Sequence, residues 1–287
     1  MPPVSLRLAI PKGRMQDNVV ALLRDAGVDI RAAERDYRPR VSLPGVEAKV
    51  LKPQNIIGML VAGARDIGFA GADWVAELEA DLVEVLNTNL DPVRLVAAAP
   101  ANLLEAGRLP NRPLVIASEY ARLTQRWIEE NDLNARLLRT WGATEVFPPE
   151  DADCIVDNCA SGATLRANDL HIVDELLTSS TRLYANPRAL EDPARRETIE
   201  NLAMLLDSVL QARRRVLIEF NVPADKLEAV IELLPCMREP TVSPLHGAGW
   251  CAVKTAAPRE QLARVIPQIR ARGGADIIVT QPGQIVP

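Results

Sequence analysis

Hydrophobic residues in the first part of the chain follow two different patterns, one after the other. Residues 6–10 form a short apolar run, and residues 19–26 repeat apolar side chains at helical spacing until Gly27. The first pattern is typical of a buried strand and the second of an amphipathic helix. A second helix is expected from Pro53, and residues 66–73 read as a short strand that runs into a glycine turn. This alternation predicts a parallel α/β sheet.

A second set of similar elements begins near residue 94. The expected strands cover residues 95–99, 114–117, 136–138 and 153–156, with a helix over 119–131. Two separate β-rich pieces are expected at 172–177 and 182–184, before a long helix that starts at Pro193. The sequence therefore predicts two α/β lobes.

The last part of the chain has a different order of elements. The pattern predicts a strand, a helix, two strands, a helix and a strand over residues 216–220, 224–233, 241–245, 250–255, 259–272 and 276–279. This βαββαβ order is ferredoxin-like. Domains with this order often sense small molecules, so fold analogy suggests a regulatory module.

Composition narrows the function classes. The chain has 287 residues, 48% of them hydrophobic, which is enough for two or three domains. Its formal net charge of −5 argues against a general nucleic-acid or anionic-membrane binder, so any anion site must be local. No apolar run approaches a membrane span, and the first residues do not look like a signal peptide. We expect a cytoplasmic protein.

The most informative segment covers residues 157–165. Asp157 ends an apolar strand, where its carboxylate can accept hydrogen bonds from sugar hydroxyls. Gly162 allows close approach of a ligand to the backbone, and the Ser161 and Thr164 hydroxyls can help successive N–H groups to surround a phosphate. The segment thus predicts a phosphosugar site. The alternative is a plain helix N-cap.

Two cations follow the first predicted strand. Lys12 and Arg14 flank Gly13 at the carboxyl edge of the sheet, where α/β proteins bind ligands. Their charges are suited to a pyrophosphate group. The alternative is a solvated basic turn without a ligand.

Taken in order, residues 8–14, 66–73 and 157–168 resemble the ATP phosphoribosyltransferase family, and residues 233–235 and 240–245 resemble the C-terminal regulatory module of its long form. The resemblance covers nearly the whole chain. It implies a two-lobed catalytic core similar to the type II periplasmic-binding-protein fold, followed by the ferredoxin-like module. The expected domains are lobe I (1–93 and 179–212), lobe II (94–178) and the regulatory domain (213–287).

The resemblance also implies roles for particular residues. The 5′-phosphate of 5-phosphoribosyl 1-pyrophosphate (PRPP) would bind Ser161, Gly162, Ala163, Thr164 and Leu165, while Asp157 would face the ribose. Lys12 and Arg14 would meet the pyrophosphate. The nucleotide cleft would include Asp73, Arg94, Tyr120 and Glu145, with Tyr120 stacking on adenine or hydrogen-bonding to it. The regulatory histidine site would comprise Asn221, Met237, Thr241 and Ile277.

The implied reaction is the transfer of the phosphoribosyl group of PRPP to N1 of ATP, the first step of histidine biosynthesis. Mg²⁺ is the implied cofactor, held mainly by substrate phosphates, and histidine is the implied inhibitor of a homo-oligomer between dimer and hexamer. Neither nucleic acid nor a membrane is expected as a partner.

The chain departs from the usual family pattern at Lys52, Asn55, Asp91–Val93, Asp169 and Asn221. Two other hypotheses stay open, and the departures at Lys52, Asn55 and Asp91–Val93 motivate the second of them. One is a solute-binding or sensor protein built on the same two-lobed fold, and the other is a catalytically weakened subunit that regulates an active partner.

Overall fold

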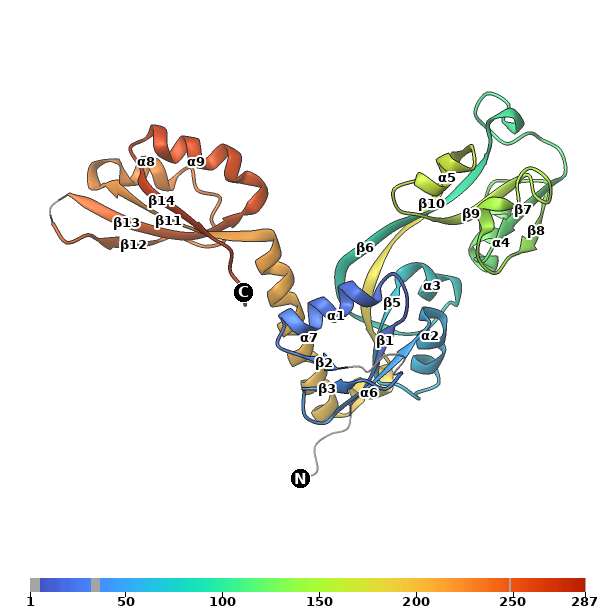
Figure 1. The fold of residues 1–287 in the computed structure, drawn as a ribbon, viewed down its shortest axis with the longest axis horizontal. Helices are drawn as coiled ribbons and strands as arrows, with labels where there is room; N and C mark the ends of the chain where they lie inside the picture. The colour runs from blue at the N-terminus through green and yellow to red at the C-terminus, as the bar shows by residue number, and fades with distance from the viewer. Residues whose placement is uncertain (1–5, 32–36, 248, 287) are drawn as a thin grey trace. The chain divides into compact units, whose positions relative to one another are not determined.

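The computed structural model describes residues 6–31, 37–247 and 249–286 (Figure 1). The chain divides into two compact units. The first comprises residues 1–24 and 28–201, and the second comprises residues 25–27 and 202–287. Among the described residues, no helix has the length and apolarity needed to span a membrane.

The first lobe of the first unit is a parallel α/β layer. Its strands are β4 (Val46–Leu51), β1 (Leu6–Pro11) and β5 (Ile67–Gly71), and its helices are α1 (Gln16–Asp25), α2 (Pro53–Val61) and α3 (Ala72–Glu77). The short pair β2 (Ile30–Arg31) and β3 (Arg40–Val41) lies apart from this sheet. Helix α2 buries Ile56, Ile57 and Leu60 in a cluster with Ala9 and Ala70. The expected strands at 6–10 and 66–73 and the two expected helices are confirmed here, whereas β4 was not predicted.

Two long antiparallel strands run through both lobes (Figure 1). They are β6 (Val83–Pro100) and β10 (Leu170–Ala185), paired from Leu170 with Pro100 to Ala185 with Val83 through several register shifts. The expectation of two separate pieces at 172–177 and 182–184 is wrong, because β10 is continuous. Polar residues 178–181 interrupt its hydrophobic pattern but remain in the strand.

The second lobe continues the same sheet. Its strands are β9 (Cys154–Cys159), β7 (Leu114–Ser118) and β8 (Ala135–Arg139), and its helices are α4 (Ala121–Glu130) and α5 (Ala163–Ala167), with short turns η1 (Ala101–Leu103) and η2 (Thr144–Val146). The full order is β4-β1-β5-β10-β6-β9-β7-β8. Insertion of antiparallel β10 between β5 and β6 gives the type II periplasmic-binding-protein-like arrangement that we expected.

Helix α6 (Pro187–Glu191) precedes the long helix α7 (Pro193–Arg214), which leads directly into the second unit. There, β11 (Arg215–Pro223), β12 (Thr241–Pro244), β13 (Trp250–Pro258) and β14 (Ala275–Thr280) form an antiparallel sheet in the order β12-β13-β11-β14. Helices α8 (Leu227–Ile231) and α9 (Leu262–Ala271), with turns η3 (Ala224–Lys226) and η4 (Arg259–Gln261), complete the ferredoxin-like order.

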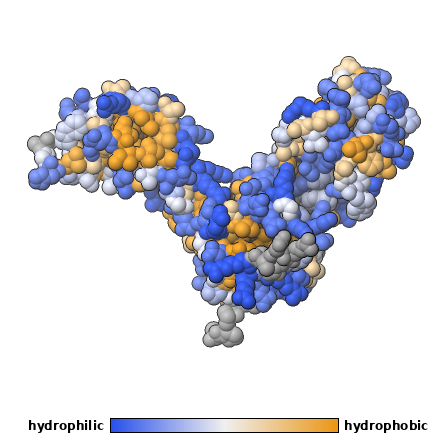
Figure 2. Space-filling model, in the orientation of Figure 1, coloured by the Kyte–Doolittle hydropathy of each residue, from blue (hydrophilic) through white to orange (hydrophobic). Residues whose placement is uncertain are grey.

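Alternation along β11 decides which face of this sheet is covered. Val216, Ile218, Phe220 and Val222 are buried in a core that includes Ile269 of α9. The intervening residues of β11 are only partly buried. Hydrophobic residues also reach the surface of this unit, as Figure 2 shows, among them Ile278 of β14. The helix expected at 224–233 is shorter in the structure, since η3 and α8 together cover 224–231.

Candidate functional site

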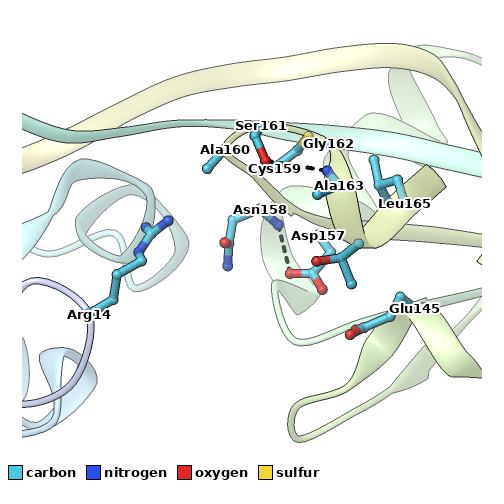
Figure 3. A pocket seen from close by; sticks show the side chains of 11 residues that line it. Arg14, Glu145, Asp157, Asn158, Cys159, Ala160, Ser161, Gly162, Ala163 and Leu165 are labelled. Carbon is cyan, nitrogen blue, oxygen red and sulfur yellow. Dashed lines mark hydrogen bonds between the residues drawn. The ribbon is translucent and has the colours of Figure 1, made fainter. Parts of the chain in front are cut away.

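The segment 157–165 lines a cavity of about 250 Å³ in the first unit (Figure 3). The other lining residues are Arg14, from the loop after β1, and Glu145 of η2. Figure 3 shows the Arg14 side chain projecting toward the loop that carries Asn158 and Ala160. The structure therefore brings an arginine of the first lobe next to the predicted phosphate loop of the second.

The conformation of the loop 157–165 depends on the backbone at Gly162. Gly162 has φ of +73°, and a Cβ there would lie 3.0 Å from Nη1 of Arg166, which donates a 3.0 Å hydrogen bond to the Ser161 carbonyl. The backbone N–H of Ala163 is 3.4 Å from Oγ of Ser161. Helix α5 starts after Gly162, which has no side chain to cap it. A plain Ser or Thr N-cap is therefore not what this sequence encodes.

Asp157 is the unusual carboxylate of the cavity. Burial raises its pKa to about 6, and the nearby charges of Glu145 and Glu119 act in the same direction. A 2.6 Å hydrogen bond from the backbone N–H of Asn158 opposes this shift without cancelling it. An acid whose charge is poorly compensated in a cavity is typical of a functional position.

A second cavity of about 260 Å³ adjoins the same residues. Arg14 and Asn158 line both cavities, and Lys12, Asp91 and residues 179–181 of β10 line only this one. Lys12 donates a 2.9 Å hydrogen bond to the Tyr37 hydroxyl. The two predicted cations are thus neighbours in space as well as in sequence.

Asp73 and Tyr120 meet in a buried network. The Tyr120 hydroxyl donates to Asp73 at 2.7 Å, and Ser179 Oγ donates to the other carboxylate oxygen at 2.8 Å. Burial and the charge of Asp73 raise the pKa of Tyr120, whose ring lies 4.7 Å from that of Trp74. Since Tyr120 is fully buried, the adenine contact implied for it stays a prediction and requires the ring to leave this network.

Glu77 makes a second buried connection between α3 and α4. Its carboxylate accepts hydrogen bonds from the backbone N–H groups of Arg122 at 3.0 Å and Leu123 at 3.0 Å, in the first turn of α4. Asp73 and Glu77 lie four positions apart on α3 and both reach the beginning of α4. We call the contact of the Glu77 carboxylate with the N–H groups of Arg122 and Leu123 the acid clamp. It joins the first lobe to the second.

Several residues here were missed by sequence reasoning. Ser179, Ser180 and Thr181 are nearly buried, although polar, and hydrogen-bond to Asp73, Asn87 and Asp91. Their run of hydroxyls inside a strand was the available signal. Arg94, by contrast, pairs with Glu175 at 3.1 Å and does not line either cavity, so its nucleotide role stays a prediction.

The four expected histidine-site residues do not converge within one chain. Met237 and Thr241 line a cavity of about 310 Å³ together with Leu217 of β11. Asn221 lies on the β11 face away from the core and donates to Asp276 at 2.9 Å, whereas Ile277 packs against the core. Their common role also stays a prediction.

Comparisons with known proteins show which family the chain belongs to. A family model described as ATP phosphoribosyltransferase matches residues 52–208, and a model of the HisG C-terminal domain matches residues 212–281. The chain belongs to the ATP phosphoribosyltransferase family. This is a glycosyltransferase family of the first step of histidine biosynthesis, and the C-terminal match identifies the long form that the sequence motifs indicated. The solute-binding hypothesis is therefore not supported.

Individual relatives agree over nearly the full length. The ATP phosphoribosyltransferase of Pelotomaculum thermopropionicum is 36% identical, with 99% of this chain and 100% of the relative covered. That of Prosthecochloris aestuarii is 37% identical, with 95% and 94% covered. The structure of the ATP phosphoribosyl transferase (HisG:HisZ) complex from Thermotoga maritima matches with a TM-score of 0.62 and 28% identity, over 70% of this chain and 98% of that one.

Proposed function

We propose that the chain transfers the 5-phosphoribosyl group of PRPP to N1 of ATP, with release of pyrophosphate and inversion at C1. The loop 161–165 binds the 5′-phosphate, because its residues, including the hydroxyl-bearing Ser161 and Thr164, line the cavity and Gly162 allows the backbone turn between them. Asp157, in its ionised form, accepts hydrogen bonds from the ribose hydroxyls. The cavity that this loop forms with Arg14 is the observation that supports the proposal.

The leaving pyrophosphate meets the cations of the first lobe. Lys12 and Arg14 line the second cavity, and Arg14 also lines the first, so both cations can face the negative charge that develops on the pyrophosphate as its bond to C1 breaks. Fixed charges that face a developing anion stabilise the transition state more than the ground state. Catalysis then rests on positioning and charge, and no covalent nucleophile is required.

The ATP base occupies the second cavity, which Asp73 and Tyr120 line, whereas Glu145 lies on the wall of the first cavity. Adenine N1 carries no proton in neutral ATP, so attack on C1 requires no general base. Release of Tyr120 from Asp73 would expose both an aromatic face and a carboxylate to the base. Binding of ATP is therefore coupled to rearrangement of the Tyr120 network.

Magnesium fits this site only in a limited way. Asp157 and Glu145 offer oxygen ligands on the wall of the first cavity, but the described residues contain no cluster of three acidic, histidine or cysteine side chains able to hold a metal. Mg²⁺ typically keeps several waters and binds one or two carboxylates plus substrate phosphates. When bound, Mg²⁺ would neutralise part of the phosphate charge.

Histidine inhibition and homo-oligomer formation are part of the same proposal. Thr241 and Met237 border one cavity, and Asn221 lies on the partly buried sheet face. A histidine bound between two copies of this module would contact Thr241 and Met237 of one copy and Asn221 of the other, although these residues do not meet within one chain. Binding of this kind would change substrate affinity about fivefold to 150-fold if the coupling has the usual size.

A pyrophosphate-release assay tests the catalytic proposal. The full chain, ATP, PRPP and Mg²⁺ are incubated with a pyrophosphatase, and phosphate is measured with each substrate omitted in turn. Release should require both substrates, fall strongly in Arg14→Gln, and persist in Arg31→Gln, whose side chain is 80% exposed. Absence of release from the folded chain alone, with release restored by a partner protein, would instead favour the weakened regulatory subunit.

A further inference from the structure

A cavity of about 460 Å³ lies in the second unit, and none of its lining residues is used by the proposed function. Its lining comprises Gln211, Arg213, Arg214, Arg215, Pro258, Arg259 and Glu260. We call it the arginine pocket. It lies where α7 passes into β11 without a connecting loop, at the junction visible in Figure 1.

The fold brings these arginines together from distant parts of the sequence. Arg214 ends α7 and Arg215 begins β11. The antiparallel register pairs Arg215 with Pro258, so Arg259, the next residue, emerges at the same end of the sheet. The β11 and β13 pairing therefore adds a fourth arginine to a run of three.

The charges in the arginine pocket are only partly compensated. Arg213 pairs with Asp25 at 2.7 Å, and Arg215 donates to the side-chain oxygen of Gln211. In the described part of the chain, Arg214 and Arg259 have no ion pair or side-chain hydrogen bond. Four arginines against Asp25 and Glu260 leave two positive charges, in a chain whose formal net charge is −5.

Stabilisation of the helix end explains only part of this arrangement. Cations in the last turn of a helix interact favourably with its dipole, which accounts for Arg213 and Arg214. It does not account for Arg259, which belongs to η4 and does not extend α7. Two exposed guanidinium groups that line one cavity, with fewer carboxylates than arginines around them, create a local positive potential that attracts anions.

We infer that the arginine pocket binds a small phosphorylated anion with at least two negative charges. The guanidinium fork matches phosphate oxygens in a bidentate manner, and a cavity of this volume lies in the range of small-molecule sites. Pro258 and the side-chain stems of the arginines supply apolar surface beside the charges. The site is separate from the proposed catalytic cavities and does not depend on their function.

Calorimetric titration of the full chain with sodium pyrophosphate, without Mg²⁺, tests the inference. Because pyrophosphate is also the proposed leaving group, every variant carries Arg14→Gln, which weakens the catalytic cavity as a competing site. In this background the pair Arg214→Gln and Arg259→Gln should weaken pyrophosphate binding at least tenfold, since each lost contact is a hydrogen bond to a charged group. Arg259→Lys should have a smaller effect, because it keeps the charge and loses the fork.

The matched control is the pair Arg264→Gln and Arg270→Gln on α9, two exposed arginines of the same unit that do not line the arginine pocket. It removes the same charge and should leave pyrophosphate binding unchanged. Equal loss in both pairs would reduce the effect to overall charge and overturn the inference. No binding to the Arg14→Gln background at millimolar pyrophosphate would overturn it as well, whatever the assay of turnover shows. Unchanged melting temperatures establish that the variants are folded.

Discussion

The acid clamp between α3 and α4 gives the sharpest prediction about stability. Glu77 is 4% exposed, and its carboxylate is the acceptor for two backbone N–H groups in the first turn of α4. These amides have no partner within their own helix, since the first turn of any helix leaves its N–H groups free. Glu77 thus performs across two lobes what an N-cap side chain performs within one helix.

The size of the effect follows from these contacts. A buried N–H group without an acceptor costs about 1–3 kcal/mol, and loss of an N-cap costs about 0.5–2 kcal/mol. Glu77→Ala removes the acceptor of two amides, so we expect it to destabilise the first unit by about 2–4 kcal/mol. Glu77→Gln keeps one oxygen but loses the charge that favours a helix N-terminus, so about 1–2 kcal/mol is expected.

Glu79→Gln is the matched control. Glu79 is two positions away, pairs with Arg126 at 3.1 Å, and its side chain is 56% exposed. Exposed ion pairs of this kind contribute about 0–1 kcal/mol, so the control should change stability little. Urea unfolding followed by far-ultraviolet circular dichroism measures the free energy of unfolding for each variant.

Hydrogen exchange provides the local measurement. If Glu77 holds the start of α4, peptides that contain Arg122 and Leu123 should exchange about thirtyfold faster in Glu77→Ala, which corresponds to about 2 kcal/mol of local opening. Peptides from the second unit should exchange at their original rate. Equal stability of Glu77→Gln and Glu79→Gln, or unchanged exchange in α4, would show that the clamp contributes nothing and would refute the reasoning.

Three further predictions concern the proposed binding sites. Thr164→Ala should raise the PRPP dissociation constant about tenfold to a hundredfold by loss of a hydrogen bond to a charged group, and calorimetry that detects no change would contradict the loop assignment. Asp157→Asn should lower turnover yet stabilise the first unit at pH 8 by roughly 1–3 kcal/mol, with no gain at pH 4. The sign follows because the pKa of Asp157, raised to about 6, makes the folded state keep its proton to higher pH than the unfolded state. The stability of the unsubstituted protein therefore falls as pH rises from about 4 through 6. Equal calorimetric melting shifts of Asp157→Asn at both pH values would disprove this reasoning. Thr241→Ala should abolish histidine binding while uninhibited turnover stays the same, and inhibition that survives the substitution would place the regulatory site elsewhere.

How much of the site the sequence predicts depends on whether its residues are local. The loop 157–165 was predictable because an apolar strand, an acid and a glycine turn lie within nine consecutive positions. The contact of Tyr120 with Asp73 and Ser179 was not, since it joins α3, the start of α4 and β10 through long-range pairing. Periodicity along one segment carries no information about which distant hydroxyl will face a given carboxylate.

The same reason explains the misread strand. Thr178–Thr181 looks like a break, because four polar residues rarely continue a buried strand. In the fold, Ser179 and Thr181 are almost fully buried, and their hydroxyls donate to Asp73 and Asp91. Carboxylates of other elements accept the hydrogen bonds of these buried hydroxyls. The hydrophobic pattern of the strand itself therefore could not reveal that these residues are buried.

The buried carboxylates of this chain differ in how far neighbouring donors and cations compensate their charge. Burial alone would raise the pKa of Asp66, but the hydrogen bonds and charge of Arg7 outweigh it and hold that pKa below its usual value. Asp73 and Glu77 each have two or more donors from neighbouring elements. Asp157 instead lines a cavity, where burial and the charges of Glu145 and Glu119 raise its pKa. A carboxylate that is costly to bury and lines the same cavity as Gly162 and Arg14 is typical of a position where a ligand supplies the missing partner.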